Sequence, residues 1–191
     1  MTTPRILVFA GSARSASLNK RLAAAAARAV QAAGAHATLL DLRDFELPLY
    51  DGDLEQRGLP PKLAELKALF KQHHGLLLAC PEYNGSITPL LKNTLDWVSR
   101  PAPGEKPLEC YEGKVAGLLA ASPGALGGLR GLVHVRAILG GIRVLVVPEQ
   151  AAIGGANKAF DEQGELVDEK QRASVNAVAG AVVRLAAKLN A

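Results

Sequence analysis

The stretch that decides the fold is RILVFAGSARSASLN, residues 5–19. Its first six residues form an apolar run that is typical of a buried parallel strand, and an Ala-rich segment with helical spacing follows. The polar turn between them therefore joins the carboxyl end of a strand to the start of a helix, where open α/β sheets collect their ligands. Gly11, Ser12 and Arg14 suit an anion. The same turn is equally consistent with a solvated loop in which Ser17 caps the helix.

The rest of the chain repeats this strand–turn–helix pattern. Apolar strands are expected at residues 5–10, 35–42, 75–80, 114–121 and 142–147. Helices with one apolar face are expected at residues 18–33, 60–74, 87–100, 129–139 and 175–189. Three connecting segments are expected to be irregular, at residues 45–60, 101–112 and 151–168. The first of them is long enough to suit a lid or a partner contact.

This alternation predicts an α/β fold with a parallel sheet. We expect a flavodoxin-like three-layer sandwich, in which a five-stranded parallel sheet in the order 2-1-3-4-5 has helices on both faces. The turns after strands one, three and four then lie along one edge of the sheet. These turns are also the richest in glycine and polar residues, with the sequences GSARSASLN, PEYNGS and SPGALGG. The coincidence favours a ligand site over a set of solvated turns.

Length and charge exclude several classes of protein. The 191 residues fit one domain, residues 1–191, with little room for a second. The 22 Lys and Arg against 18 Asp and Glu are scattered without a basic block, so nucleic-acid binding is not indicated. No apolar run approaches the roughly 20 residues of a membrane span, and the N-terminus lacks the core of a signal peptide. We therefore expect a cytoplasmic protein without membrane contact.

Five single residues have structural interpretations at this stage. Cys80 and Cys110 lack metal-binding spacing, and we expect no metal site, disulfide or iron–sulfur cluster. His73 and His74 fall at the end of a predicted helix and are interpreted as structural residues rather than ligands. Trp97 lies beside the broad apolar face of its helix, which is mostly core but also permits a subunit interface.

The turn residues also narrow the chemistry. The phosphate-binding patterns GxxxxGK[ST] and GxGxxG are missing from the sequence. Ser12, Ser86 and Ser122 lack the GxSxG setting of a nucleophile, and Glu82 is the only carboxylate in the three turns. A cofactor is therefore expected to carry the reaction. A phosphate-binding first turn, with the two other turns flanking a flat cavity, suits a mononucleotide with a planar ring.

Three motifs together resemble a known family. They are GSxRxxSxN at residues 11–19, PEYNGS at 81–86 and LKNxxDW at 91–97. In this order and at this separation they are similar to the NADPH-dependent FMN reductase family, which includes bacterial quinone, chromate and azo-dye reductases. The resemblance covers about residues 5–150.

The resemblance implies a flavodoxin-like fold that binds FMN non-covalently and takes electrons from NADPH or NADH. The chemistry would take place on flavin N5 without a protein catalytic residue. Two electrons would pass to a small acceptor such as a quinone, with chromate, azo dyes and free flavin as further candidates. The residues implied to bind the cofactor are Ser12, Arg14, Ser17, Leu18 and Asn19 for the phosphate and ribityl chain, Pro81, Glu82, Tyr83, Asn84 and Gly85 along the ring, and Ser122 and Gly124 on its other side.

The alternative function is a non-enzymatic, flavodoxin-like electron carrier. The basic charge and the broad apolar helix favour self-association over such a role, and the resemblance implies a homodimer or homotetramer. Arg130 matches a position that in some relatives reaches a neighbouring subunit's site, whereas Val133 stands where some relatives have an aromatic residue. Glu82 is interpreted either as a substrate-positioning group or as a solvated or arginine-paired carboxylate.

Overall fold

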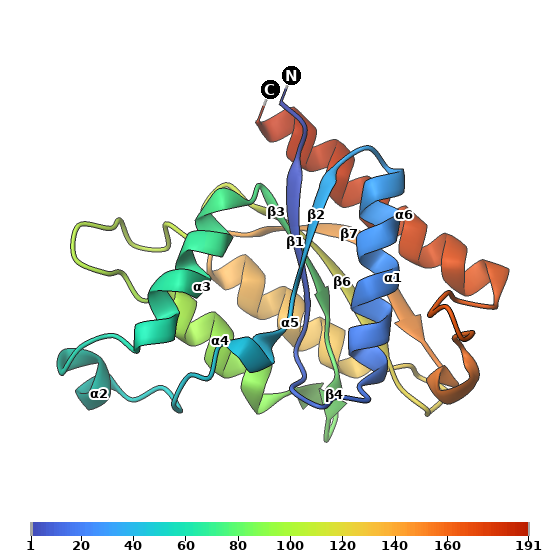
Figure 1. Ribbon diagram of the computed structural model, residues 1–191, viewed down its shortest axis with the longest axis horizontal. Coiled ribbons are helices and arrows are strands. Elements are labelled where there is room, and N and C mark those ends of the chain that lie inside the picture. The colour runs from blue at the N-terminus through green and yellow to red at the C-terminus, as the bar shows by residue number, and fades with distance from the viewer. Residues whose placement is uncertain (1, 191) are drawn as a thin grey trace.

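The computed structural model describes residues 2–190, and its central feature is a five-stranded parallel sheet (Figure 1). The strand order β2-β1-β3-β6-β7 confirms the predicted order 2-1-3-4-5. The strands are β1 (Arg5–Ala10), β2 (His36–Leu40), β3 (Gly75–Ala79), β6 (Val115–Ala121) and β7 (Leu145–Ile153).

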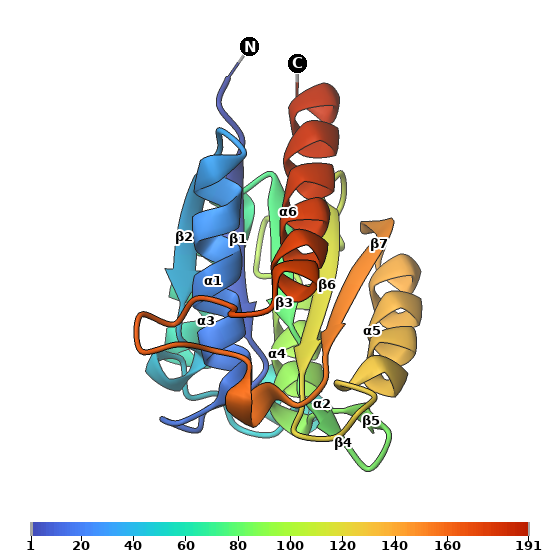
Figure 2. The same cartoon turned by 90° about the vertical axis from the view of Figure 1, so that its right-hand side faces the viewer.

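Helices cover both faces of the sheet (Figure 2). One face carries α1 (Leu18–Ala32) and α6 (Glu169–Leu189), and the other carries α3 (Pro61–Gln72), α4 (Pro89–Ser99) and α5 (Leu129–Gly141). Short 3₁₀ turns lie at Leu42–Asp44 (η1) and Ala156–Lys158 (η2). Within residues 2–190 no helix combines the length and the apolar character that crossing a bilayer requires.

Strand β1, which lies between β2 and β3, explains why an unbroken apolar run indicates this fold. Ile6 and Val8 pack into the core beneath α1 and α6, whereas Leu7 and Phe9 pack into the core beneath the other helices. All four side chains are fully buried. Because successive side chains of a strand point to opposite faces, only a sheet covered on both sides needs every residue of the strand to be apolar.

The last strand differs from the prediction. Residues 142–147 were expected as the strand and residues 151–168 as mostly loop, but β7 continues to Ile153. The helix α5 runs through Gly141, and Arg143 then adopts a φ of 67° as the chain turns into β7. Pro148 lies within β7, which is an edge strand of the sheet, and an edge strand tolerates a residue without an N–H donor. The predicted strand ended too early because Pro148 is typical of a strand end.

Segment 45–60 packs against α4 rather than standing free. It contains a short helix, α2 (Gly52–Gln56). The Trp97 Nε1 donates a hydrogen bond to the Pro48 carbonyl at 2.8 Å, and the Tyr50 ring meets the indole edge-on at a centroid distance of 5.1 Å. Trp97 is fully buried, so this side chain belongs to the core.

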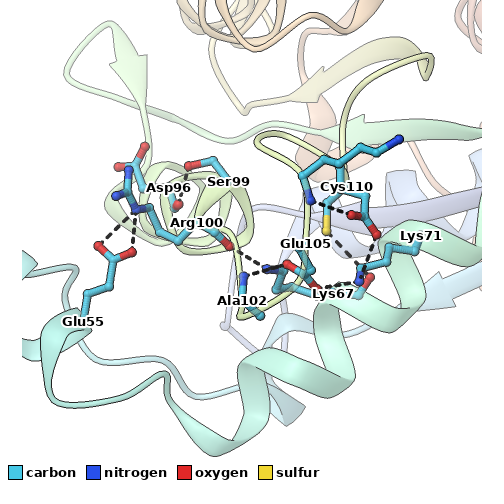
Figure 3. Close-up of polar contacts among 11 residues, drawn as sticks. Glu55, Lys67, Lys71, Asp96, Ser99, Arg100, Ala102, Glu105 and Cys110 are labelled. Atoms are coloured by element: carbon cyan, nitrogen blue, oxygen red, sulfur yellow. Dashed lines mark hydrogen bonds and ion pairs between the residues drawn. The ribbon is translucent and has the colours of Figure 1, made fainter.

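Segment 101–112 is fastened to α3 by ion pairs (Figure 3). Glu105 pairs with Lys67 and Lys71, and Glu109 pairs with Lys71 at 3.3 Å. Lys67 is buried, with 3% of its side chain exposed, and also donates to the Arg100 carbonyl at 2.5 Å. The two irregular segments thus cover the α3–α4 side of the molecule.

The histidines after α3 act as structural residues. The His73 Nδ1 donates to the Leu69 carbonyl at 2.6 Å, so that Nε2 accepts from the Thr38 hydroxyl at 2.7 Å. The His74 Nδ1 accepts the Arg5 backbone N–H at 3.0 Å. Burial lowers the pKa of His73 and favours its neutral form. These contacts lie near the start of β1, at the opposite edge from the polar turns.

Candidate functional site

The turns that follow β1, β3 and β6 meet at the carboxyl edge of the sheet, which is the lower edge in Figure 1. They enclose a cavity of about 310 Å³. Nine of the twelve predicted site residues line it, together with three that were not predicted. The lining consists of Ser12, Arg14, Ala16, Ser17, Leu18 and Asn19, then Pro81, Glu82 and Tyr83, then Ala121, Ser122 and Pro123.

The first turn presents the N-terminus of α1 to this cavity. The Ser17 hydroxyl caps the helix by accepting the Lys20 N–H at 3.4 Å. The first N–H groups of a helix have no partner within it, and no acidic side chain lies in the first turn of α1. Arg14, which is exposed, adds a guanidinium to these donors. The turn therefore offers a positive end to an anionic group.

Gly11 lets this turn approach α4 closely. A Cβ at this position would lie 2.8 Å from the Leu91 Cβ, which is too close for any side chain. The Gly11 N–H donates to the Ala79 carbonyl at 2.9 Å, and its own carbonyl accepts the Thr88 hydroxyl at 2.8 Å. The first turn is thus joined to the end of β3 and to the start of α4. The glycine is required by packing as well as by the turn.

Asn19 joins the first turn to the third. Its Nδ2 donates to the Ala121 carbonyl at 2.9 Å, and its Oδ1 accepts the Ala121 N–H at 2.9 Å. The residue is buried, with 5% exposed. Both hydrogen-bonding atoms of the amide are therefore engaged by the backbone at the end of β6. Asn19 lines the cavity, but its side chain serves to join the first turn to the end of β6.

The second turn is a two-residue β-hairpin, formed by β4 (Glu82–Tyr83) and β5 (Ser86–Ile87). Asn84 and Gly85 sit at its tip with positive φ angles of 51° and 78°. This Asn-Gly pair is the preferred sequence for such a tight turn, so a hairpin signal was present in a segment predicted only as a polar turn. The tip lies outside the cavity lining, whereas Pro81, Glu82 and Tyr83 form part of the wall.

Glu82 is paired with an arginine, which was one of its two interpretations. Its Oε1 accepts from the Arg130 Nε at 2.9 Å and Nη2 at 2.5 Å, and its Oε2 accepts the Gly131 N–H at 3.1 Å. Burial opposes ionisation of the carboxyl, but these hydrogen bonds outweigh it and lower the pKa of Glu82. Ser86 adds a hydrogen bond of 2.7 Å to His134. The hairpin is thereby fastened to the start of α5.

The third turn contributes Ala121, Ser122 and Pro123 to the wall. The Ser122 hydroxyl accepts the Gly124 N–H at 3.3 Å, which orders the turn, while Gly124 itself lies outside the lining. Gly127 has a φ of 61°, and a Cβ there would lie 2.6 Å from the Ala152 carbonyl carbon. A side chain at this position would therefore clash with the backbone of β7.

The donor set fits a mononucleotide such as FMN. The first turn contributes a helix N-terminus, two serines and Arg14 to the cavity, which suit a terminal phosphate. The second and third turns contribute Pro81, Tyr83 and Pro123, which offer apolar surfaces to a planar ring. Glu82, the one carboxylate among the lining residues that the structure describes, is neutralised by Arg130 and does not repel an anion.

Comparison with known proteins agrees with this geometry. Residues 4–158 match the family described as NADPH-dependent FMN reductase. This chain belongs to that family. It is 37% identical over 170 residues to an NAD(P)H-dependent FMN reductase of Pseudomonas aeruginosa, a match that covers 88% of this chain and 87% of the relative. It is 32% identical over 168 residues to a quinone reductase of Escherichia coli K12, covering 86% of each chain.

A solved structure supports the same assignment. The flavoenzyme FerB, an NAD(P)H:(acceptor) oxidoreductase from Paracoccus denitrificans, superposes with a TM-score of 0.82 at 26% identity, covering 97% of this chain and 98% of that one. As a member of the FMN reductase family, the chain is an FMN-dependent oxidoreductase that uses NAD(P)H. The resemblance stated from the motifs is confirmed.

Four residues in or beside this cavity were not predicted from the sequence. Ala16, Ala121 and Pro123 line the cavity with backbone and small apolar surface, which leaves no chemical signature in a sequence. Arg43 donates two hydrogen bonds to the Ala13 carbonyl in the first turn. The sequence indicated a place for Arg43 near this edge of the sheet only through its position just after the strand predicted at residues 35–42.

Proposed function

We propose that this chain passes two electrons from NADPH or NADH through FMN to a small, quinone-like acceptor. The cavity at which three turns meet is the single observation that carries this proposal. When bound there, FMN supplies the redox chemistry that protein side chains lack. Relatives named as quinone reductase and NADPH azoreductase support quinones and azo dyes as acceptors. Chromate and free flavin are further candidates.

The first turn would hold the phosphate and ribityl chain. Ser12, Ser17 and Arg14 would donate hydrogen bonds together with the N–H groups at the start of α1. Leu18 would contact the ribityl chain with its apolar side chain. Asn19 would act through its bonds to Ala121, which set the distance between the first and third turns.

The second and third turns would enclose the ring. Pro81, Glu82 and Tyr83 would border one side, and Ser122 with its neighbours would border the other. Asn84, Gly85 and Gly124, which lie outside the lining, would set the shape of these turns rather than contact the cofactor. Glu82 would keep the hairpin against α5 by binding Arg130. Tyr83 is 52% exposed and would stand where the nicotinamide and the acceptor enter.

The test is oxidation of NADPH by the purified full-length chain. The preparation should be yellow, retain FMN through gel filtration and consume NADPH rapidly only when menadione is added. A yellow protein without turnover on menadione or free FMN would indicate the electron carrier instead. A protein that binds no FMN would contradict both functions.

Assembly and location are also proposals. We infer a homodimer or homotetramer, supported by the exposed apolar side chains Leu126, Leu129 and Val133 at and before the start of α5. We further infer a cytoplasmic location, supported by Cys80 and Cys110, which are free and buried rather than bridged. Light scattering of the purified protein and cell fractionation test these two inferences.

A further inference from the structure

Arg43, in the turn η1 just after β2, contacts the phosphate end of the site without lining it. Its Nε and Nη2 donate hydrogen bonds of 3.1 and 2.6 Å to the same oxygen, the Ala13 carbonyl. A guanidinium can present two N–H groups to one side in this way because its donors are held in a rigid plane. The residue is separated from Ala13 by 30 positions in the sequence.

This contact fixes the peptide that carries Arg14. In a trans peptide the C=O of Ala13 and the N–H of Arg14 point in opposite directions. The carbonyl points toward Arg43, and the Arg14 N–H is held by the Ser12 hydroxyl at 3.3 Å. The peptide plane is therefore held at both ends, and the direction in which Arg14 leaves the backbone is fixed with it.

Asp41 connects Arg43 to the first turn of α1. Its Oδ1 accepts the Arg43 N–H at 3.0 Å, and its Oδ2 accepts from the Lys20 Nζ at 2.6 Å. Burial opposes ionisation of Asp41, but the bonds from Lys20 and Arg43 outweigh it and lower its pKa. Lys20 in turn donates its N–H to the Ser17 cap. The network thus runs from β2 around the outer wall of the phosphate end.

We propose that Arg43 is a positioning residue for the cofactor phosphate, which acts by orienting the Ala13–Arg14 peptide. This inference rests on the proposed function, because it assigns Arg43 a role at the FMN site. It predicts an effect confined to ligands that carry a phosphate. Riboflavin, which has the same ring and ribityl chain but no phosphate, should be indifferent to Arg43.

The experiment compares Arg43→Ala with the wild type and with Arg57→Ala, which removes the same charge from an exposed position in segment 45–60. Flavin-free full-length protein is titrated with FMN and with riboflavin by flavin fluorescence, at about 0.1 M and about 1 M salt. We expect Arg43→Ala to raise the Kd for FMN about three- to tenfold, as loss of hydrogen bonds of ordinary strength would. The Kd for riboflavin should stay within about twofold, and Arg57→Ala should match the wild type.

The other outcomes would overturn the inference. Equal losses for FMN and riboflavin would show a general structural defect. An FMN effect that disappears at high salt would show long-range attraction by the Arg43 charge rather than orientation of the peptide. Unchanged FMN affinity in Arg43→Ala, with a wild type that binds FMN, would overturn this inference alone. A wild type that binds no FMN would overturn the proposed function and the inference together.

Discussion

Within residues 2–190, Arg14 is the one cationic side chain in the cavity lining, and we propose that it binds the FMN phosphate. Replacing it with alanine should weaken FMN binding by about 1.5–3 kcal/mol, which is the range for a hydrogen bond to a charged group. Fluorescence titration of the flavin-free protein measures the effect, with Arg57→Ala as the charge-matched control. Affinity equal to that of the wild type would place the phosphate away from residue 14.

At the same scale, Glu82 shows what a sequence can and cannot tell about a site. Its position in the second turn could be predicted, because it follows the apolar strand β3 directly. Its partner could not, because Arg130 lies 48 residues away on α5 and the pairing depends on how the hairpin folds back. Nine of the predicted site residues line the cavity because their turns follow the apolar strands β1, β3 and β6. Asn84, Gly85 and Gly124 lie in the same turns but outside the lining, because the path of each turn decides which of its residues face the cavity.

At the scale of the elements, Asn19 joins α1 to β6. Asn19→Ala should lower the free energy of unfolding by about 2–4 kcal/mol, because the Ala121 N–H and C=O would both lose buried partners. Urea unfolding measures the loss, with the exposed Asn157→Ala as the matched control. A loss below that of the control variant would mean that solvent replaces both bonds.

The elements themselves could be predicted to different degrees. The strands and their parallel arrangement followed from apolar runs and from alternation, since a strand buried on both faces needs an apolar residue at every position. The order followed from the flavodoxin-like arrangement that five such strands favour. The extent of β7 did not follow, because Pro148 mimics the end of a strand unless its edge position is known. The burial of Trp97 depends on segment 45–60, whose path carries no periodic signal.

At the scale of the whole molecule, Glu105 fastens segment 101–112 to α3 (Figure 3). Burial raises the pKa of its carboxyl, but hydrogen bonds from Lys67 and Lys71 outweigh this and lower it from 4.5 to about 2. A carboxyl whose pKa is lowered by folding stabilises the protein above its unfolded pKa. That stabilisation is lost as the pH falls from 4.5 toward 2.

We therefore predict that the fall in the free energy of unfolding at acid pH depends on Glu105. The wild type should lose about 3 kcal/mol more than Glu105→Gln over this pH range. At pH 7 Glu105→Gln should itself be about 3 kcal/mol less stable, because Lys67 would keep its buried charge without a counter-ion. Denaturant unfolding at several pH values measures both effects, and the exposed Glu162→Gln should follow the wild type. Parallel pH curves for wild type and Glu105→Gln would contradict the prediction.

The most direct test of the proposed FMN site is a crystal structure of the full-length protein with FMN bound. The phosphate should accept hydrogen bonds from the N–H groups at the start of α1 and lie beside Arg14. The ring should lie between residues 81–83 and 121–123. A flavin bound elsewhere, or bound in the reverse direction with its ring at the start of α1, would contradict the proposed FMN site.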